Sequence, residues 1–389
     1  MPFSSILKSL PDQFFAQLVA KVNQKIAAGY DVINLGQGNP DLPTPRYIIE
    51  ALQQAVAEPD NHKYSQFRGN HIYKQACADF YQKNYGVTLD PETEIAVLGG
   101  SKIGLVELPL TVMEPGDTLL LPDPGYPDYL SGTELARAKK ELLPLKPENG
   151  YLPDYSQVDE KILAAAKLLY LNYPNNPTGA QATPEFFAET VKVAKENDFQ
   201  VVHDFAYGAL GDGITPPISF MTTEGAKDVG IEFYTLSKTF NMAGWRVAFA
   251  VGNKELIAAI NLLQDHLFVG IFPALQVAGA TALQGDGKDI AALVETYRKR
   301  RQTFIQAAEK IGWQAYPSSG AFYCWMPVAE GYTSEAFADL LLEKASVAVA
   351  AGNGFGEQGE GYVRVGLTIE EPRLIEAVER IAALELFNS

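Results

Sequence analysis

Residues 232–251 read EFYTLSKTFNMAGWRVAFAV, in which two apolar runs flank a segment of hydroxyl and basic side chains. The runs, Glu232–Thr235 and Val247–Val251, are short, and polar and apolar residues do not alternate along them. Such runs are typical of strands that are buried on both faces of a sheet. The segment therefore predicts two strands of a covered sheet, with Lys238 just beyond the end of the first strand.

Similar runs begin near residue 94 and alternate with helical stretches. They are Glu94–Leu98, Thr118–Leu121, Leu168–Leu171 and Gln200–His203. Strands that alternate with helices along a chain predict an α/β domain built on a mostly parallel sheet.

Both ends of the chain predict a second, smaller α+β domain. An apolar residue every four positions from Phe14 to Ile26 predicts an amphipathic helix. Charged helices are predicted over 293–310 and 372–386, with strand-like pieces at 321–325 and 362–365 between them. We therefore expect a large domain over residues 46–288 and a small one formed by 1–45 and 289–389.

The composition restricts the partners. Among 389 residues, 31 Lys and Arg stand against 47 Asp and Glu, a net charge of −16, which argues against nucleic-acid and membrane binding. The longest uncharged run, Leu267–Gly285, contains Pro273 and three glycines, so we expect a buried or subunit-interface helix there and no membrane span. Two cysteines suit a reducing compartment and predict a cytoplasmic location.

Polar residues follow five of the predicted strands at the point where each strand ends. In chain order they are Ser101 and Lys102, Tyr126, Asn176, Asp204 and Tyr207, and Ser237 and Lys238. Ligands of open α/β sheets bind beyond the carboxyl ends of the strands. The sequence therefore predicts one site to which all five segments contribute.

These motifs carry a family resemblance. Ser237-Lys-Thr-Phe-Asn-Met-Ala-Gly-Trp-Arg246, with Asn176-Pro-Thr-Gly179 and Asp204-x-x-Tyr207, resembles the class I/II aminotransferases. The likeness extends from residues 34–41 to 361–366. It implies the fold called type I, with a mostly parallel central sheet in the large domain, and the cofactor pyridoxal 5′-phosphate.

The resemblance also implies roles for the residues that would surround the cofactor ring. Lys238 would hold the cofactor aldehyde covalently and, once released, shuttle a proton as a free amine. Asp204 would pair with the pyridine nitrogen and keep it protonated. Tyr207 and Asn176 would bind the phenolic oxygen, and Tyr126 would stack on the ring.

Four residues would bind the cofactor phosphate, namely Ser101, Lys102, Ser237 and Arg246. The first two open a predicted helix, whose free N–H groups attract anions, and the arginine offers a planar fork. By analogy with the family, Tyr64 would reach the phosphate of a neighbouring subunit. This role implies a homodimer with shared active sites.

The amino acid and 2-oxo acid substrates would be held by their α-carboxylate. Arg364 would bind this group bidentately, with the Gly38 backbone and Asn176 assisting.

Two other patterns are set aside. Gly354, Gly356 and Gly359 match a dinucleotide-binding pattern, but strand-like residues follow them where a helix is required, so NAD is not predicted. His203 stands beside Asp204, yet the four histidines show no ligand spacing. We therefore predict no metal site and place His203 in the core or behind the site.

The predicted function is amino-group transfer between an L-amino acid and a 2-oxo acid by a ping-pong mechanism. Segments 10–15, 31–35 and 171–175 are similar to bacterial transaminases that act on 4-methylthio-2-oxobutanoate to form methionine. LL-diaminopimelate or aspartate aminotransferase remains an alternative, although no second substrate-facing arginine can be placed. A carbon–sulfur β-lyase with the same cofactor and a non-catalytic regulator on the same fold are further alternatives. Such regulators carry an added DNA-binding domain, for which we expect no spare length before residue 30.

Overall fold

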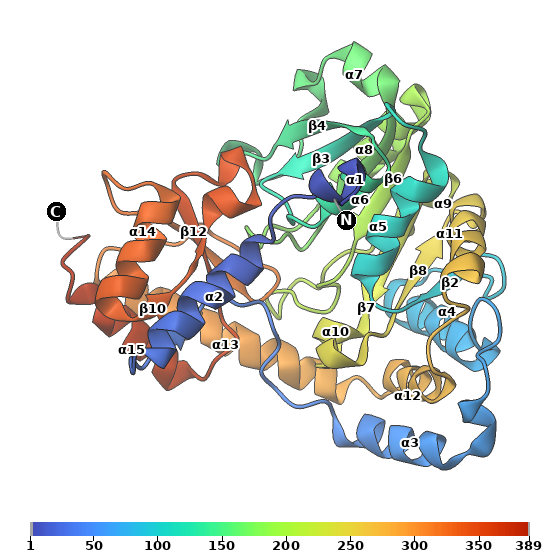
Figure 1. Cartoon of the computed structure of the whole chain (residues 1–389), viewed down its shortest axis with the longest axis horizontal. Coiled ribbons are helices and arrows are strands. Elements are labelled where there is room, and N and C mark those ends of the chain that lie inside the picture. Colours follow the sequence, from blue (N-terminus) through green and yellow to red (C-terminus); the bar gives the residue numbers. More distant parts are fainter. Residues whose placement is uncertain (1–2, 388–389) are drawn as a thin grey trace.

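The computed structural model describes residues 3–387, and a seven-stranded sheet forms its centre (Figure 1). The strand order is β2-β8-β7-β6-β5-β3-β4. The strands are β2 (Ile95–Leu98), β3 (Thr118–Asp123), β4 (Lys139–Pro144), β5 (Ala166–Leu171), β6 (Gln200–Asp204), β7 (Gly230–Thr235) and β8 (Ala248–Gly252). β8 runs antiparallel to both of its neighbours, and the other neighbouring pairs are parallel. The predicted mostly parallel sheet is therefore confirmed.

Strand β4 was not among the predicted strands. It lies at the edge of the sheet, and its first residues, Lys139, Lys140 and Glu141, are charged and largely exposed. An edge strand has one unpaired side and tolerates such residues, so it lacks the apolar run by which the buried strands were identified.

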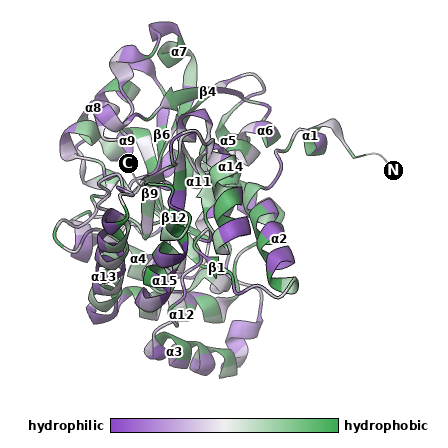
Figure 2. Ribbon diagram, turned by 90° about the vertical axis from the view of Figure 1, so that its left-hand side faces the viewer, coloured by the Kyte–Doolittle hydropathy of each residue, from purple (hydrophilic) through white to green (hydrophobic). Residues whose placement is uncertain are grey.

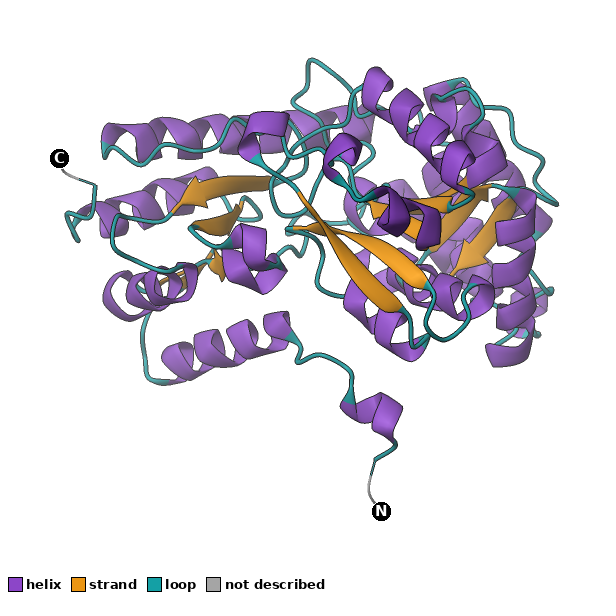
Figure 3. Cartoon of the chain, turned by 90° about the horizontal axis from the view of Figure 1, so that it is seen from above, coloured by secondary structure: helices purple, strands orange, loops and turns teal. Residues whose placement is uncertain are grey.

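Helices cover both faces of the sheet (Figure 3). Ile95 and Val97 of β2 pack into one hydrophobic cluster, while Ala96 and Leu98 point into another. The helices on the two faces are α4 (His71–Tyr85), α8 (Pro184–Asn197) and α12 (Pro273–Leu283) on the first, and α5 (Ser101–Val112), α6 (Tyr129–Leu135) and α11 (Lys254–Leu267) on the second. Burial on both faces explains the absence of alternation in the strand sequences, and the helix predicted within 267–285 is confirmed as buried α12.

A separate hydrophobic cluster lies around two small sheets. These sheets contain β9 (Tyr323–Pro327), β11 (Ala350–Ala351) and β12 (Tyr362–Gly366), and β1 (Ile33–Asn34) with β10 (Val347–Ala348). The helices of this part are α13 (Lys288–Lys310), α14 (Ser334–Leu340) and α15 (Glu371–Ala382). α13 begins at Lys288, before the predicted residue 293, and Ile290 in its first turn already has helical spacing with Leu293 and Val294.

The N-terminal helix α2 (Phe14–Ala27) confirms the predicted amphipathic helix and lies against this second part (Figure 1). The short helix α1 (Ser5–Lys8) projects from the body of the molecule (Figure 2). The remaining helices are α3 (Arg46–Ala57), α7 (Glu160–Ala165), α9 (Ala226–Val229) and α10 (Leu236–Thr239).

The structure bears on the glycine-rich pattern and on the long uncharged run of the sequence. The glycine-rich segment 352–359 forms two 3₁₀ turns and then enters β12, so the strand-like continuation predicted from the sequence is confirmed. Within residues 3–387, no helix combines the length and the apolar character that crossing a membrane requires.

Candidate active site

The predicted site residues meet at a cavity of about 320 Å³ beyond the carboxyl ends of the parallel strands. All but one of the residues predicted to bind cofactor or substrate line it: Gly38, Ser101, Lys102, Tyr126, Asn176, Asp204, Tyr207, Ser237, Lys238, Arg246 and Arg364. The exception is Tyr64, whose side chain lies on the surface and is 95% exposed.

The topology explains why these residues converge. Asp204 is the last residue of β6, and Lys238 lies in the short helix α10 directly after β7. Because these strands are parallel neighbours, their ends reach the same edge of the sheet. Arg364 comes from β12 of the small sheet and Gly38 from the segment after β1, so the cavity lies between the two parts of the chain.

Asp204 has one carboxylate oxygen that accepts a hydrogen bond and one that accepts none within residues 3–387. The residue is 6% exposed, and its Oδ2 accepts a hydrogen bond from the Tyr129 hydroxyl at 2.8 Å. Its Oδ1 has no partner among the described residues. Burial raises the pKa of Asp204 to about 6, although the Tyr129 bond and the charge of His203 oppose the shift. A buried carboxylate of this kind favours a cationic N–H group as its partner.

Lys238 places an amine beside that carboxylate. Its Nζ donates to the Gly38 carbonyl oxygen at 2.6 Å. Burial lowers the pKa of Lys238 to about 8, and the positive charges of Arg364 and Arg246 act in the same direction. The amine is therefore neutral more readily than an exposed lysine, which suits both a nucleophile and a proton carrier.

An anion cradle forms where β2 leads into α5. Gly100 has φ +106°, and a Cβ atom at this residue would overlap the guanidinium of Arg246. That guanidinium therefore lies at the N-terminus of α5, where free N–H groups attract anions. Lys102 pairs with the buried carboxylate of Asp128 at 2.7 Å, so Arg246 is the cation of the cradle whose charge is not compensated by a carboxylate within the described part of the chain.

Arg364 is 1% exposed and is held from several sides. One terminal nitrogen donates to Asn176 Oδ1 at 2.7 Å and the other to the Gly36 carbonyl oxygen at 3.0 Å. Aromatic rings surround the guanidinium, with Tyr323 at 4.2 Å and Phe15 at 5.1 Å from ring centroid to Cζ. Its Nε has no partner in residues 3–387, and the group is thus oriented for a further acceptor.

Several residues around the cavity were not predicted, and four of them contact Asp204 or Arg364. Asn172 donates to the Asp204 carbonyl oxygen at 2.7 Å, Tyr129 binds the Asp204 carboxylate, and Tyr323 and Phe15 line the wall. Asn172 directly follows the predicted strand 168–171, and Tyr129 follows the predicted strand 118–121 by a few residues. Their positions after these strands could have identified both as site residues. Tyr323 and Phe15 lie within core-like patterns that give no such signal.

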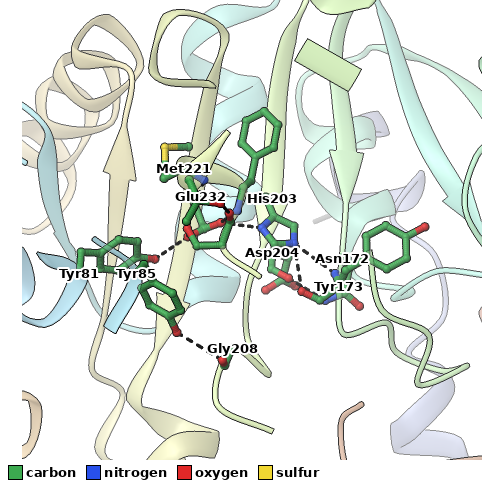
Figure 4. A network of polar contacts seen from close by, with 12 residues as sticks. Tyr81, Tyr85, Asn172, Tyr173, His203, Asp204, Gly208, Met221 and Glu232 are labelled. Atoms are coloured by element: carbon green, nitrogen blue, oxygen red, sulfur yellow. Dashed lines mark hydrogen bonds and ion pairs between the residues drawn. The ribbon is translucent and has the colours of Figure 1, made fainter. Parts of the chain in front are cut away.

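His203 belongs to a buried polar network behind the site (Figure 4). Its Nδ1 lies 2.7 Å from Glu232 Oε2, and its Nε2 lies 3.1 Å from the Tyr173 carbonyl oxygen. Glu232 also accepts a hydrogen bond from the Tyr81 hydroxyl at 2.7 Å. His203 therefore lies in the core, as predicted. Across residues 3–387, no group of His, Cys, Asp and Glu side chains is arranged to hold a metal ion.

These features together fit one kind of molecule. The unpaired oxygen of Asp204 suits a protonated ring nitrogen, the cradle at Gly100 suits a phosphate, and Lys238 suits an aldehyde. Pyridoxal phosphate carries all three groups on one aromatic ring, so the residues present fit this cofactor.

The chain was compared with known proteins. The family described as aminotransferase class I and II matches residues 30–381. An L-glutamine–4-(methylsulfanyl)-2-oxobutanoate aminotransferase of Bacillus subtilis is 62% identical over 99% of this chain and 97% of that protein. An LL-diaminopimelate aminotransferase of Aquifex aeolicus is 45% identical over 99% of each chain. Substrate-bound BacF of Bacillus subtilis has a similar structure, with a TM-score of 0.96, 47% identity and complete coverage of both chains.

Proposed function

The chain belongs to the class I and II aminotransferases, which work with pyridoxal phosphate, and on this premise we propose its substrates and the roles of its residues. The enzyme transfers an amino group between an amino acid and a 2-oxo acid. We propose that the acceptor is 4-methylsulfanyl-2-oxobutanoate, that L-glutamine is the donor and that the product is methionine, as the name of the 62% identical relative suggests.

The charges that this chain itself contributes to the cavity support this choice of acceptor. Lys102 is paired with Asp128, Arg246 lies at the anion cradle, and Arg364 is available for the α-carboxylate. The described cavity wall offers no further arginine for a second carboxylate. Because burying an unpaired carboxylate is costly, a 2-oxo acid with an uncharged side chain is favoured over a dicarboxylic one.

A panel of 2-oxo acids tests the choice. We expect kcat/KM for 4-methylsulfanyl-2-oxobutanoate to exceed that for oxaloacetate by at least about 100-fold, because the second carboxylate would lack a partner. The measurement is the rate of product amino acid formation with a fixed donor. Strong activity with dicarboxylic acids alone would overturn the proposal, and pyruvate and ammonia from cystathionine would identify a β-lyase instead.

The residues of the cavity have different proposed roles in the reaction. When bound, pyridoxal phosphate supplies an electron sink for the charge that develops at the substrate Cα. We propose that Asp204 keeps the ring nitrogen protonated, that Tyr207 and Asn176 bind the phenolic oxygen and that Tyr126 covers the ring. Lys238 removes the proton from Cα and later returns one as an acid.

The remaining contacts fix the two anionic groups. Ser101, Ser237, Arg246 and the backbone at Lys102 would hold the phosphate, where the N-terminus of α5 provides free N–H groups. Arg364, with the backbone of Gly38, would hold the substrate carboxylate. Asn176 already accepts from Arg364 at 2.7 Å, so the arginine is oriented before substrate enters.

The lowered pKa of Lys238 gives a pH prediction. Protonated amine cannot attack an aldehyde, so the rate at which cofactor-free protein takes up pyridoxal phosphate should rise with pH and level off above about 8. Stopped-flow absorbance at a series of pH values measures this rate. A rise that continues beyond pH 10 would show that burial and the two arginines do not lower the pKa of this amine.

We further propose a homodimer with shared active sites. Tyr64 would then reach the partner's phosphate, and its 95% exposure leaves it free to do so. Phe67, Leu267 and Phe272 are also exposed apolar residues. The segments that carry them lie together, since Arg68 pairs with Asp265 at 3.4 Å, and an exposed apolar patch of this kind is typical of an interface.

Two other proposals concern the whole chain. The division into a large domain, 46–288, and a small domain, 1–45 with 289–389, is supported by the separate hydrophobic cluster around the small sheets. A cytoplasmic location is supported by two cysteines that are both buried and free.

A further inference from the structure

Tyr207 and Tyr323 form a pair of buried hydroxyls at the boundary between the two parts of the chain. Their oxygens are 2.9 Å apart, and the side chains are 5% and 1% exposed. Tyr207 follows β6 of the large sheet, whereas Tyr323 is the first residue of β9. Both residues line the cavity.

The pair has two hydroxyl protons, and only one of them is used between the two oxygens. Each hydroxyl has one proton and two lone pairs, and neither oxygen makes another hydrogen bond within residues 3–387. One proton is therefore used between the two hydroxyls, and the other is left for a group in the cavity. If Tyr323 donates to Tyr207, the Tyr207 proton is the one that remains.

The ring of Tyr323 is held in place beside Tyr207, and either hydroxyl could donate to the other. It stacks against Arg364 at 4.2 Å, and its hydroxyl lies against Gly38, where a Cβ atom would overlap it. The charged groups that face Tyr207 are Arg364 from β12 and Asp204 from β6. Burial raises the pKa of Tyr207, so this hydroxyl stays neutral and acts through the direction of its proton.

We propose that Tyr323 is a positioning residue that donates to Tyr207 and so directs the Tyr207 proton at the phenolic oxygen of the cofactor. The proposal rests on the function proposed above. It also gives the pair two states. With a proton on the phenolic oxygen, Tyr207 would accept a hydrogen bond there and donate its own proton to Tyr323, whose proton would turn toward the cavity, without either tyrosine ionising.

A double-mutant cycle tests this with Y207F, Y323F and the double variant. The readout is the pH midpoint of the absorbance of the bound cofactor. A donor to the phenolic oxygen stabilises negative charge there and lowers this midpoint, so Y207F should raise it. Y323F should raise it in the same direction by the equivalent of about 2- to 10-fold in proton affinity, the effect of one hydrogen bond. In the Y207F background, the second substitution should change nothing.

Steady-state kinetics and a matched control separate this role from a structural one. Phenylalanine at position 323 keeps the ring beside Arg364, so KM for the 2-oxo acid should stay within about 2-fold while kcat falls by about 2- to 10-fold. Y155F removes a buried hydroxyl of the same kind, bonded to Thr190 at 2.8 Å away from the cavity, and should leave midpoint and kcat unchanged.

The outcomes distinguish the role proposed for Tyr207 from the role inferred for Tyr323. A protein that binds no pyridoxal phosphate, or a Y207F variant with an unchanged midpoint, would remove the proposed role of Tyr207. A shift in Y207F but none in Y323F would overturn the inference alone. Equal shifts from Y323F in the presence and absence of the Tyr207 hydroxyl would also overturn it, because Tyr323 would then act independently.

Discussion

Lys238→Ala is expected to lower kcat by about 10⁴-fold, the upper end of what one acid–base group contributes. The expectation is this large because the same amine would hold the cofactor and carry the substrate proton. The amine lies in the cavity, 2.6 Å from the Gly38 carbonyl oxygen and beside Asp204. Lys102 also lines the cavity, but it is paired with the carboxylate of Asp128.

Two measurements check this prediction. One is turnover with the preferred donor and acceptor, and the other is the mass of the protein after borohydride reduction, which should show covalently retained cofactor only when Lys238 is present. Lys192→Ala, on the outer face of α8 with a side chain 72% exposed, is the matched control. Wild-type turnover in Lys238→Ala would refute the assigned site.

Asp204→Asn should lower kcat by about 10²- to 10³-fold, the usual effect of losing one preorganised charged contact. Asparagine can still accept the hydrogen bond of Tyr129, so the local structure should persist. What is lost is the negative charge that keeps the ring nitrogen protonated. The measurement is kcat with saturating substrates and cofactor.

The same substitution should stabilise the cofactor-free protein. The pKa of Asp204 is raised from 3.8 to about 6, so folding favours the protonated carboxyl. Its contribution to stability is fully present below pH 3.8 and is lost as pH rises through about 6. Cofactor-free Asp204→Asn should therefore have a higher Tm than wild type at pH 7 to 8, and the difference should shrink toward pH 4.

Thermal unfolding of the two cofactor-free proteins across this pH range measures the effect. Asp198→Asn is the control, because Asp198 is exposed at the C-cap of α8 in the left-handed region, which asparagine also tolerates. A Tm difference that does not vary with pH would show that ionisation of Asp204 is not its cause.

The candidate site was predictable to the extent that it depends on the ends of strands. Asp204 and Lys238 follow apolar runs that could be recognised in the sequence, and parallel neighbours necessarily present their ends at one edge of the sheet. Edge strand β4 was missed because its charged residues lack that pattern. Helix α13 was predicted too short, although Ile290 has helical spacing with Leu293 and Val294 and so marks the earlier start.

The sequence by itself determined the fold class, the family resemblance and the set of residues at the sheet edge, because these follow from local patterns and short motifs. The tertiary structure alone decided what those residues touch. It paired Lys102 with Asp128, left Asp204 Oδ1 without a donor from the described residues and joined Tyr207 to Tyr323. Charge compensation, burial and proton direction depend on distances between side chains from separate elements, and no local pattern records those distances.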